Sequence, residues 1–194
     1  YDAMAQSSNV FHALLVAEIG PAKLVDMAHR LGITSSLPEV CPLALGTGEV
    51  SPLEMASAFA TLFNRGENCQ PFPITHIEDR DGNLLWEHTP DCEQVVDEQI
   101  ADRVVDLMAG VVEPGGTARV ANLGEWPTRG KTGTTDDYID AWFVGGVRQL
   151  ATAAWLGYEN GNRYFVDNET ARENCGDMAG DGIACPSDAF STQL

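Results

Sequence analysis

Five consecutive residues, Lys131-Thr132-Gly133-Thr134-Thr135, most restrict what this chain can fold into. Threonine favours extended backbone, and the apolar segment 141–144 follows after a polar turn, so the run predicts a strand. Because alternate side chains of a strand share a face, Lys131 and Gly133 should point one way and Thr132 and Thr134 the other. A cation beside several hydroxyls suits a carboxylate and an oxyanion, and Gly133 leaves room for a ligand backbone.

Lys131 stands out because the chain is strongly acidic. It is one of only two lysines among 194 residues, which carry 29 acidic and 11 basic side chains and a formal net charge of −18. This balance disfavours nucleic acid and anionic membrane surfaces as partners. A hydrophobic content of 44% is enough for a domain with a core and argues against disorder.

The start of the chain carries no targeting signal that we recognise. No apolar run is long enough to span a bilayer, and no signal peptide opens the sequence. The chain starts with Tyr1 and has no initiator methionine there, so we expect an internal fragment of a longer protein. Any anchor or export signal is then expected upstream.

Four helices are expected before the strand at 131–135. The first covers residues 10–19, and the second begins at Pro21 and ends at Gly32. The third begins with a capping box between Ser51 and Glu54 and ends at Gly66, and the fourth follows Asp97 and ends before Gly115-Gly116-Thr117. Their periodic apolar positions are expected in the core: Leu24, Met27, Ala28 and Leu31; Ala56, Phe59, Ala60 and Phe63; Ile100, Val104, Leu107, Met108 and Val111.

A hairpin is expected between the third and fourth helices. Residues 72–80 and 84–88 have strand character, and Asp81-Gly82 between them suits a tight turn. His76 and His88 should then lie near each other, but two histidines without a third ligand do not predict a metal site. Residues 150–158 add a further strand, so the fold class is expected to be α+β.

Ser7-Ser8-Asn9 is open to two interpretations. Serine and asparagine are preferred helix starters, and a helical pattern follows at once, so this segment alone predicts an N-cap. The alternative comes from the family resemblance described next, which implies that Ser7 and Asn9 belong to a catalytic site together with Lys131. The lysine run stands at the later position that this resemblance expects, which favours the second interpretation.

The lysine run resembles the third motif of the penicillin-binding proteins and serine β-lactamases. Residues 131–145 and 44–56 look more like the transpeptidase domain of class A (bifunctional) penicillin-binding proteins than like the class B enzymes or β-lactamases. The resemblance runs from about Ser7 to Tyr158 and implies an antiparallel sheet with helices on both faces. We therefore expect a transpeptidase portion over residues 1–159 and an acidic extension of uncertain role over residues 160–194.

The resemblance also implies roles for individual residues. Ser7 matches a proton relay, Asn9 a residue that holds the substrate amide, and Lys131 the cation of the catalytic site. The substrate-binding residues it implies are Thr132, Gly133, Thr134 and Thr135, with Thr47 of the 46–48 loop as a weaker candidate. The implied reaction is acyl transfer from peptidoglycan stem peptides ending in D-Ala-D-Ala, with β-lactams as donor mimics, without cofactor or metal, in an extracytoplasmic and membrane-anchored protein.

One part of that machinery is missing from the sequence. An S-x-x-K motif has a serine three residues before its lysine. The residue at that place is Gly20 for Lys23 and Thr128 for Lys131, so the sequence contains no such motif and no nucleophile. Three readings remain: part of an active transpeptidase completed by an N-terminal segment carrying S-x-x-K, a non-catalytic β-lactam or peptidoglycan sensor, or a hydrolase of the carboxypeptidase or β-lactamase type. On the first reading the fragment alone is inactive.

The five cysteines show neither C-x-x-C nor zinc-like spacing. Cys69 and Cys92 flank the expected hairpin and their midpoint falls beside Asp81-Gly82, so a regular hairpin would bring them together as a disulfide. Cys175 and Cys185 are expected to close a second, shorter loop. Cys41 is then left unpaired or bonded outside this chain.

Overall fold

The computed structural model describes residues 1–135 and 139–158. The chain divides into two compact units. The first comprises residues 1–133 and 142–155, and the described part of the second comprises residues 134–135, 139–141 and 156–158. The predicted extension at 160–194 and the predicted bridge between Cys175 and Cys185 lie outside the described residues.

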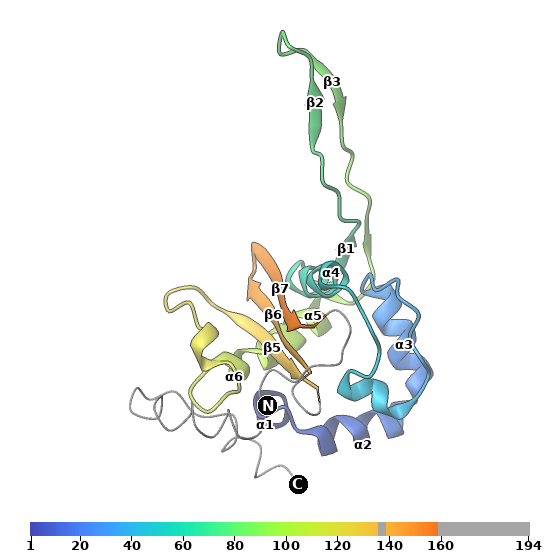
Figure 1. Cartoon of the computed structure of the whole chain (residues 1–194), viewed down its shortest axis with the longest axis vertical. Coiled ribbons are helices and arrows are strands. Elements are labelled where there is room, and N and C mark those ends of the chain that lie inside the picture. Colours follow the sequence, from blue (N-terminus) through green and yellow to red (C-terminus); the bar gives the residue numbers. More distant parts are fainter. Residues whose placement is uncertain (136–138, 159–194) are drawn as a thin grey trace. The chain divides into compact units, whose positions relative to one another are not determined.

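The helices of the first unit fall in two groups along the chain (Figure 1). Ahead of the strands come α1 (Asp2–Ala5), α2 (Asn9–Ile19), α3 (Pro21–Arg30), the 3₁₀ turn η1 (Cys41–Leu45) and α4 (Pro52–Phe63). After the hairpin come α5 (Glu98–Leu107), α6 (Ala109–Val112) and the 3₁₀ turn η2 (Arg119–Ala121).

Three small sheets accompany these helices. Strands β1 (Glu67–Cys69) and β4 (Cys92–Gln94) pair antiparallel, as do β2 (His76–Glu78) and β3 (Leu84–Glu87), which run side by side in Figure 1. The third sheet has the order β5-β6-β7, formed by β5 (Arg129–Thr134), β6 (Asp140–Val147) and β7 (Leu150–Gly157). The predicted strands at 131–135 and 150–158 and the predicted α+β class are confirmed.

The expected helix starts are correct, but three details of the helices were wrong. Ser51 and Glu54 form the predicted capping box, and Asp97 caps α5. The fourth helix does not run on to Val111, because Met108 separates α5 from α6. Ile100 is 56% exposed, and Ala60 is exposed as well. Their expected burial was wrong because helical spacing tells which residues share a face but not whether that face is covered.

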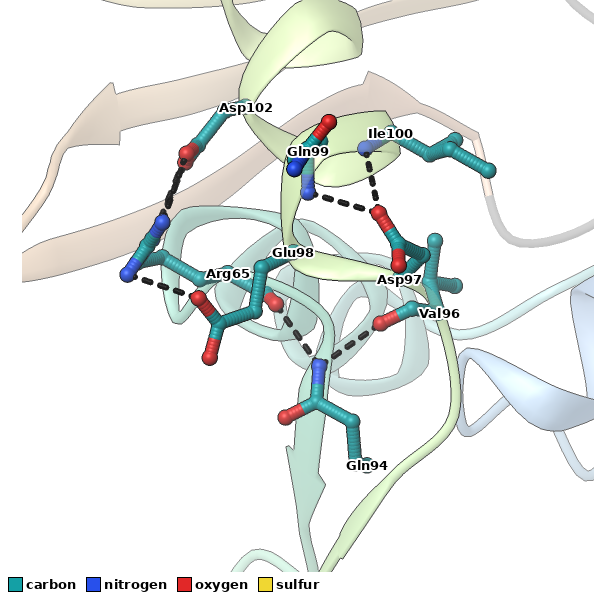
Figure 2. Close-up of polar contacts among 8 residues, drawn as sticks. All are labelled: Arg65, Gln94, Val96, Asp97, Glu98, Gln99, Ile100 and Asp102. Atoms are coloured by element: carbon teal, nitrogen blue, oxygen red, sulfur yellow. Dashed lines mark hydrogen bonds and ion pairs between the residues drawn. The ribbon is translucent and has the colours of Figure 1, made fainter.

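The turn after α4 is ordered by polar contacts of Arg65 and Gln94 (Figure 2) and by a close backbone approach at Gly66. Arg65 and Gly66 both adopt positive φ, and a Cβ on Gly66 would lie 2.2 Å from the Val96 carbonyl oxygen, so only glycine fits. The Gln94 side-chain amide donates to the carbonyl oxygens of Arg65 and Val96, at 2.8 and 2.6 Å. The Arg65 guanidinium forms ion pairs with Glu98 and Asp102 of α5, as Figure 2 shows. These contacts join the end of α4 to the start of α5.

The predicted hairpin and its disulfide are confirmed, with shorter strands than expected. Gly82 lies in the turn with φ of +82°, and the turn is closed by a hydrogen bond from the Asp79 amide to the Asn83 carbonyl oxygen. Cys69 and Cys92 face each other across β1 and β4 and are bonded. Cys41 is exposed and forms no disulfide within the part of the chain that the structure describes.

A small apolar cluster ties α1 to the segment that leads into β5. Val111 and Val112 of α6 pack with Ala118, and Met4 and Phe143 lie against them. Gly110 permits the approach of α1, because a Cβ there would lie 2.7 Å from the Tyr1 ring and 3.1 Å from the Ala5 Cβ. The turn after α1 is therefore fixed against α6.

Glu54 connects the start of α4 to the loop that follows α3. Its carboxylate accepts hydrogen bonds from the Ser51 amide, from the Thr34 and Ser35 amides, and from the hydroxyls of all three residues, at 2.7–2.9 Å. The Ser51 amide makes the largest contribution to a pKa of Glu54 well below the usual carboxyl range, followed by the hydroxyls of Thr34 and Ser35. The charged carboxylate is thus a structural link in its own right.

We predict that Glu54→Ala loosens the loop at residues 34–35. Hydrogen bonds to a charged group at a partly exposed site contribute about 1 kcal/mol, so amide exchange at Thr34 and Ser35 should accelerate roughly fivefold in the intact protein. Because the pKa is lowered, this stabilisation is present at neutral pH and lost only as the pH falls below the ordinary carboxyl range.

Hydrogen exchange with mass-spectrometric detection measures the effect. Glu39→Ala, which removes an exposed carboxylate from the loop leading to η1, is the matched control and should leave both amides unchanged. Equal exchange at residues 34–35 in the two variants would contradict the proposed link.

Candidate functional site

Lys131 and Ser7 meet although 124 positions separate them in the sequence. The Lys131 Nζ donates a hydrogen bond to the Ser7 Oγ at 2.6 Å and another to the carbonyl oxygen of Thr132 at 3.0 Å. Both side chains are half-buried. The two motifs singled out in the sequence therefore share one site within the first unit.

The cap of α2 leaves the Ser7 hydroxyl available for this contact. Ser8, and neither Ser7 nor Asn9, is the N-cap: its Oγ accepts from the Phe11 amide at 3.4 Å. Ser7 itself lies in the turn between α1 and α2 with φ of 54°, a conformation that is uncommon outside glycine. The helix-start interpretation thus applies to Ser8, while Ser7 faces Lys131.

Burial changes the chemistry of Lys131. Desolvation of the ammonium group lowers its pKa from 10.5 to about 8, because the charged form is the one that loses hydration. At neutral pH the side chain still carries its proton in most molecules. It is a fixed cation that can give up a proton at modest cost, which suits both anion binding and proton transfer.

The next strand residue has a partner that the sequence did not reveal. The Thr132 Oγ1 lies 2.8 Å from the Thr117 Oγ1, which belongs to the loop after α6. In the sequence, Gly115-Gly116-Thr117 was interpreted only as the end of a helix. No local pattern could have identified the contact, because Thr117 and Thr132 are joined by tertiary structure alone.

The lack of a side chain at Gly133 has a structural reason. A Cβ at this position would lie 3.3 Å from the Cβ of Trp142, which is tighter than ordinary contact. The neighbouring strand β6 therefore favours glycine here, whether or not a ligand backbone also approaches.

The remaining candidates occupy three different environments. Thr134, in the second unit, ends β5 and is exposed. In the same unit the Thr135 amide donates to the Asp140 carbonyl oxygen at 3.1 Å, and the Asp140 amide donates to the Thr135 Oγ1 at 2.8 Å. Asn9 and Thr47 have exposed side chains, Asn9 as the first residue of α2 and Thr47 between η1 and α4.

The histidines and cysteines of the described residues form no ligand set with one another. His76 lies opposite Glu87 in the register of the hairpin. The His88 ring stacks on Phe72 with centroids 3.6 Å apart. Glu67, Cys69 and Cys92 cluster, but both sulfurs are consumed by the disulfide. Within the described ranges, no helix is both long and apolar enough to cross a membrane.

Comparisons with known proteins agree on one family. The penicillin binding protein transpeptidase domain matches residues 1–162. The chain is 38% identical over 157 residues to penicillin-binding protein 1A of Aquifex aeolicus and 35% identical over 164 residues to penicillin-binding protein 2D of Bacillus subtilis. Each match covers 81% of this chain but only 21% and 23% of those relatives, so the chain spans about a fifth of their length.

Solved structures show the same fold. The PonA1 protein of Mycobacterium tuberculosis, in complex with penicillin V, superposes with a TM-score of 0.76 at 28% identity, covering 87% of this chain and 50% of that one. Penicillin-binding protein 1A of Haemophilus influenzae gives a TM-score of 0.78 at 23% identity, covering 86% of this chain and 31% of that one. The expected fold is confirmed.

We predict that the Lys131 amine titrates near pH 8 in the intact protein, because burial disfavours its charged form. Only the neutral amine reacts with an acylating reagent. The yield of labelled Lys131, quantified by peptide mass spectrometry across pH, should therefore reach half of its plateau near pH 8.

Denatured protein serves as the control, because burial is lost there and the midpoint should rise toward 10.5. Identical midpoints for native and denatured protein would show that Lys131 is not desolvated.

Proposed function

Because this chain belongs to the penicillin-binding protein transpeptidase domain family, within its class A group, we propose that it forms the substrate-binding part of a serine D,D-transpeptidase. The intact enzyme cross-links peptidoglycan by acyl transfer from stem peptides ending in D-Ala-D-Ala, and β-lactams acylate it as donor mimics. Ser7, Asn9 and Lys131 are its catalytic residues in this chain. Thr132, Gly133, Thr134 and Thr135 bind the donor.

The hydrogen bond from Lys131 to Ser7 carries the proposal. An ammonium that donates to a serine oxygen leaves the hydroxyl hydrogen of that serine free to point elsewhere. Ser7 can therefore pass a proton to a leaving nitrogen while its oxygen stays fixed by Lys131. If the contact between Lys131 and Ser7 served only as a surface ion pair or a helix cap, the lysine would have no need to be desolvated.

The lysine run fits two groups of the donor, its terminal carboxylate and the carbonyl group that is attacked. The Lys131 charge and the Thr132 and Thr134 hydroxyls neutralise and hydrogen-bond the terminal carboxylate, and charge-assisted bonds of this type are strong in a partly desolvated site. The Thr134 backbone N–H serves the oxyanion of the tetrahedral intermediate. Asn9, exposed at the start of α2, holds the donor amide.

Acyl transfer proceeds in two balanced steps. A serine hydroxyl attacks the carbonyl carbon of the penultimate D-alanine, the peptide bond breaks, and the departing D-alanine takes a proton through Ser7. An acceptor amine then attacks the acyl-serine ester, a new amide forms, and the serine regains its proton. In a β-lactam the broken amide remains attached through the ring, so no leaving group departs and the ester persists.

The nucleophile comes from a segment outside these 194 residues, because the sequence contains no S-x-x-K. The surface of α2 supports a missing partner: Val10, Phe11, Leu14 and Leu15 are 71%, 50%, 65% and 42% exposed. A helix that is apolar on all sides is typically buried in a complete domain. We propose that an N-terminal segment carrying S-x-x-K covers this helix.

The location that we propose is extracytoplasmic, with the intact protein anchored in the membrane. The Cys69–Cys92 disulfide supports this, because disulfides persist in oxidising compartments. A peptidoglycan substrate is found there as well.

We predict that Lys131→Ala slows acylation of the intact protein by fluorescent penicillin about ten- to hundredfold. The variant loses a charge-assisted contact to the ligand carboxylate that contributes on the order of 1.5–3 kcal/mol. Lys131→Arg keeps the charge and should retain part of the rate.

Lys23→Ala is the matched control, because Lys23 is the only other lysine and is exposed on α3. It should acylate at the wild-type rate. An unchanged rate in Lys131→Ala would remove Lys131 from the site. Absence of any labelling of the wild-type protein would favour a non-catalytic sensor, and rapid release of the acyl group would favour a hydrolase.

We further predict that the 194-residue chain alone neither acylates nor behaves as an ordered monomer. At about 25 cal/mol per Å², several hundred Å² of uncovered apolar surface cost on the order of 10 kcal/mol, comparable with the stability of a whole domain. Size-exclusion chromatography with light scattering tests whether the chain is an ordered monomer, and penicillin labelling tests whether it acylates. A compact monomer with a cooperative melt would refute the structural half, and covalent labelling would refute the assignment of the nucleophile.

A further inference from the structure

The loop Gly115–Ala118 contacts both halves of the Ser7–Lys131 site. On the Ser7 side, the Gln6 side-chain amide donates to the Gly115 carbonyl oxygen at 2.5 Å, and the Thr117 amide donates to the Ala5 carbonyl oxygen at 3.3 Å. On the strand side, the Thr117 Oγ1 lies 2.8 Å from the Thr132 Oγ1. One residue, Thr117, thus joins the turn that holds Ser7 to the strand that holds Lys131.

The loop is held by its own contacts with α6. A Cβ on Gly116 would lie 2.1 Å from the Gly110 carbonyl oxygen and 2.3 Å from that of Val111, so the backbone runs against α6 where only glycine fits. The Ala118 amide donates to the Val111 carbonyl oxygen at 2.8 Å, and the Ala118 side chain is buried against Val111 and Val112. Thr117 therefore projects from a fixed piece of backbone.

Either hydroxyl can donate in the contact between Thr117 and Thr132, and the direction of this hydrogen bond decides where the Thr132 hydrogen points. A threonine hydroxyl has one hydrogen and accepts through its oxygen. When Thr117 donates to the Thr132 oxygen, the single hydrogen of Thr132 is left to donate to a third group. In the proposed function that group is the carboxylate of the donor or of a β-lactam.

We propose that Thr117 is a positioning residue of the transpeptidase site, which orients the Thr132 hydroxyl toward the ligand carboxylate. The inference rests on the proposed function and deepens it. Thr117 acts through Thr132, and its effect appears in ligand binding before the bond-making step. Its backbone contact to Ala5 does not depend on the side chain and persists in variants.

The experiment measures the two stages of β-lactam acylation in the intact protein: the dissociation constant of the initial complex and the first-order acylation rate. Thr117→Val keeps the shape of the side chain and removes the hydroxyl, so the dissociation constant should rise about three- to tenfold with little change in the acylation rate. Thr117→Ala should behave alike, and serves if valine does not pack. Thr117→Ser should restore binding to within about twofold.

A double-variant cycle shows whether Thr117 acts through Thr132. The double variant Thr117→Val/Thr132→Val should lose less binding free energy than the two single variants together. The reason is that Thr132→Val then removes a hydroxyl that has already lost its orientation. Thr89→Val, a change at an exposed threonine after β3, is the matched control and should leave both constants unchanged.

Three results would overturn the proposal: an unchanged dissociation constant in Thr117→Val and Thr117→Ala, a serine variant as impaired as valine, or additive effects of the two threonine changes. Lys131→Ala in the same assay distinguishes a failure of the role of Thr117 from a failure of the proposed function. If Lys131→Ala impairs β-lactam binding or acylation while the Thr117 variants leave the dissociation constant unchanged, only the role of Thr117 fails. If Lys131→Ala also leaves both the dissociation constant and the acylation rate unchanged, the proposed function fails as well.

Discussion

The site depends on one hydrogen bond, from the Lys131 ammonium to the Ser7 hydroxyl at 2.6 Å. Each partner is held by a separate part of the fold. Ser8 caps α2 and leaves the Ser7 hydroxyl free, while α1 is fixed against Gly110 of α6. Lys131 lies on β5, whose neighbour β6 packs Phe143 against the cluster around α6. The contact between two distant motifs is therefore a product of the packing around α6.

The second constraint is the electrostatic position of Lys131. In a chain of net charge −18 the general field repels anionic ligands, so in the proposed function the half-buried Lys131 cation attracts them only at short range. Burial also lowers its pKa to about 8, which brings the ammonium within reach of proton transfer near neutral pH. In the proposed function, the same desolvation serves both carboxylate binding and proton movement.

The sequence was most informative where neighbours in the chain decide the structure. The Ser51–Glu54 capping box and the turn at Gly82 follow from short spacings, and the Cys69–Cys92 bridge follows from the hairpin between the two cysteines. All three were predicted correctly. The sequence could not show that Ile100 is exposed, because periodicity does not tell what covers a face. It also gave no sign of the contact between Thr117 and Thr132, because this contact depends on how the loop after α6 folds back.

The most direct test of the central claim is a crystal structure of the intact protein acylated by a β-lactam. We expect an ester on a serine outside these 194 residues, with the ligand carboxylate within hydrogen-bond distance of the Thr132 hydroxyl and close to the Lys131 ammonium. The Ser7 oxygen should remain bonded to Lys131 and lie next to the nitrogen of the opened ring. A ligand carboxylate bound by other residues, with the contact between Ser7 and Lys131 unchanged and distant from the ligand, would contradict it.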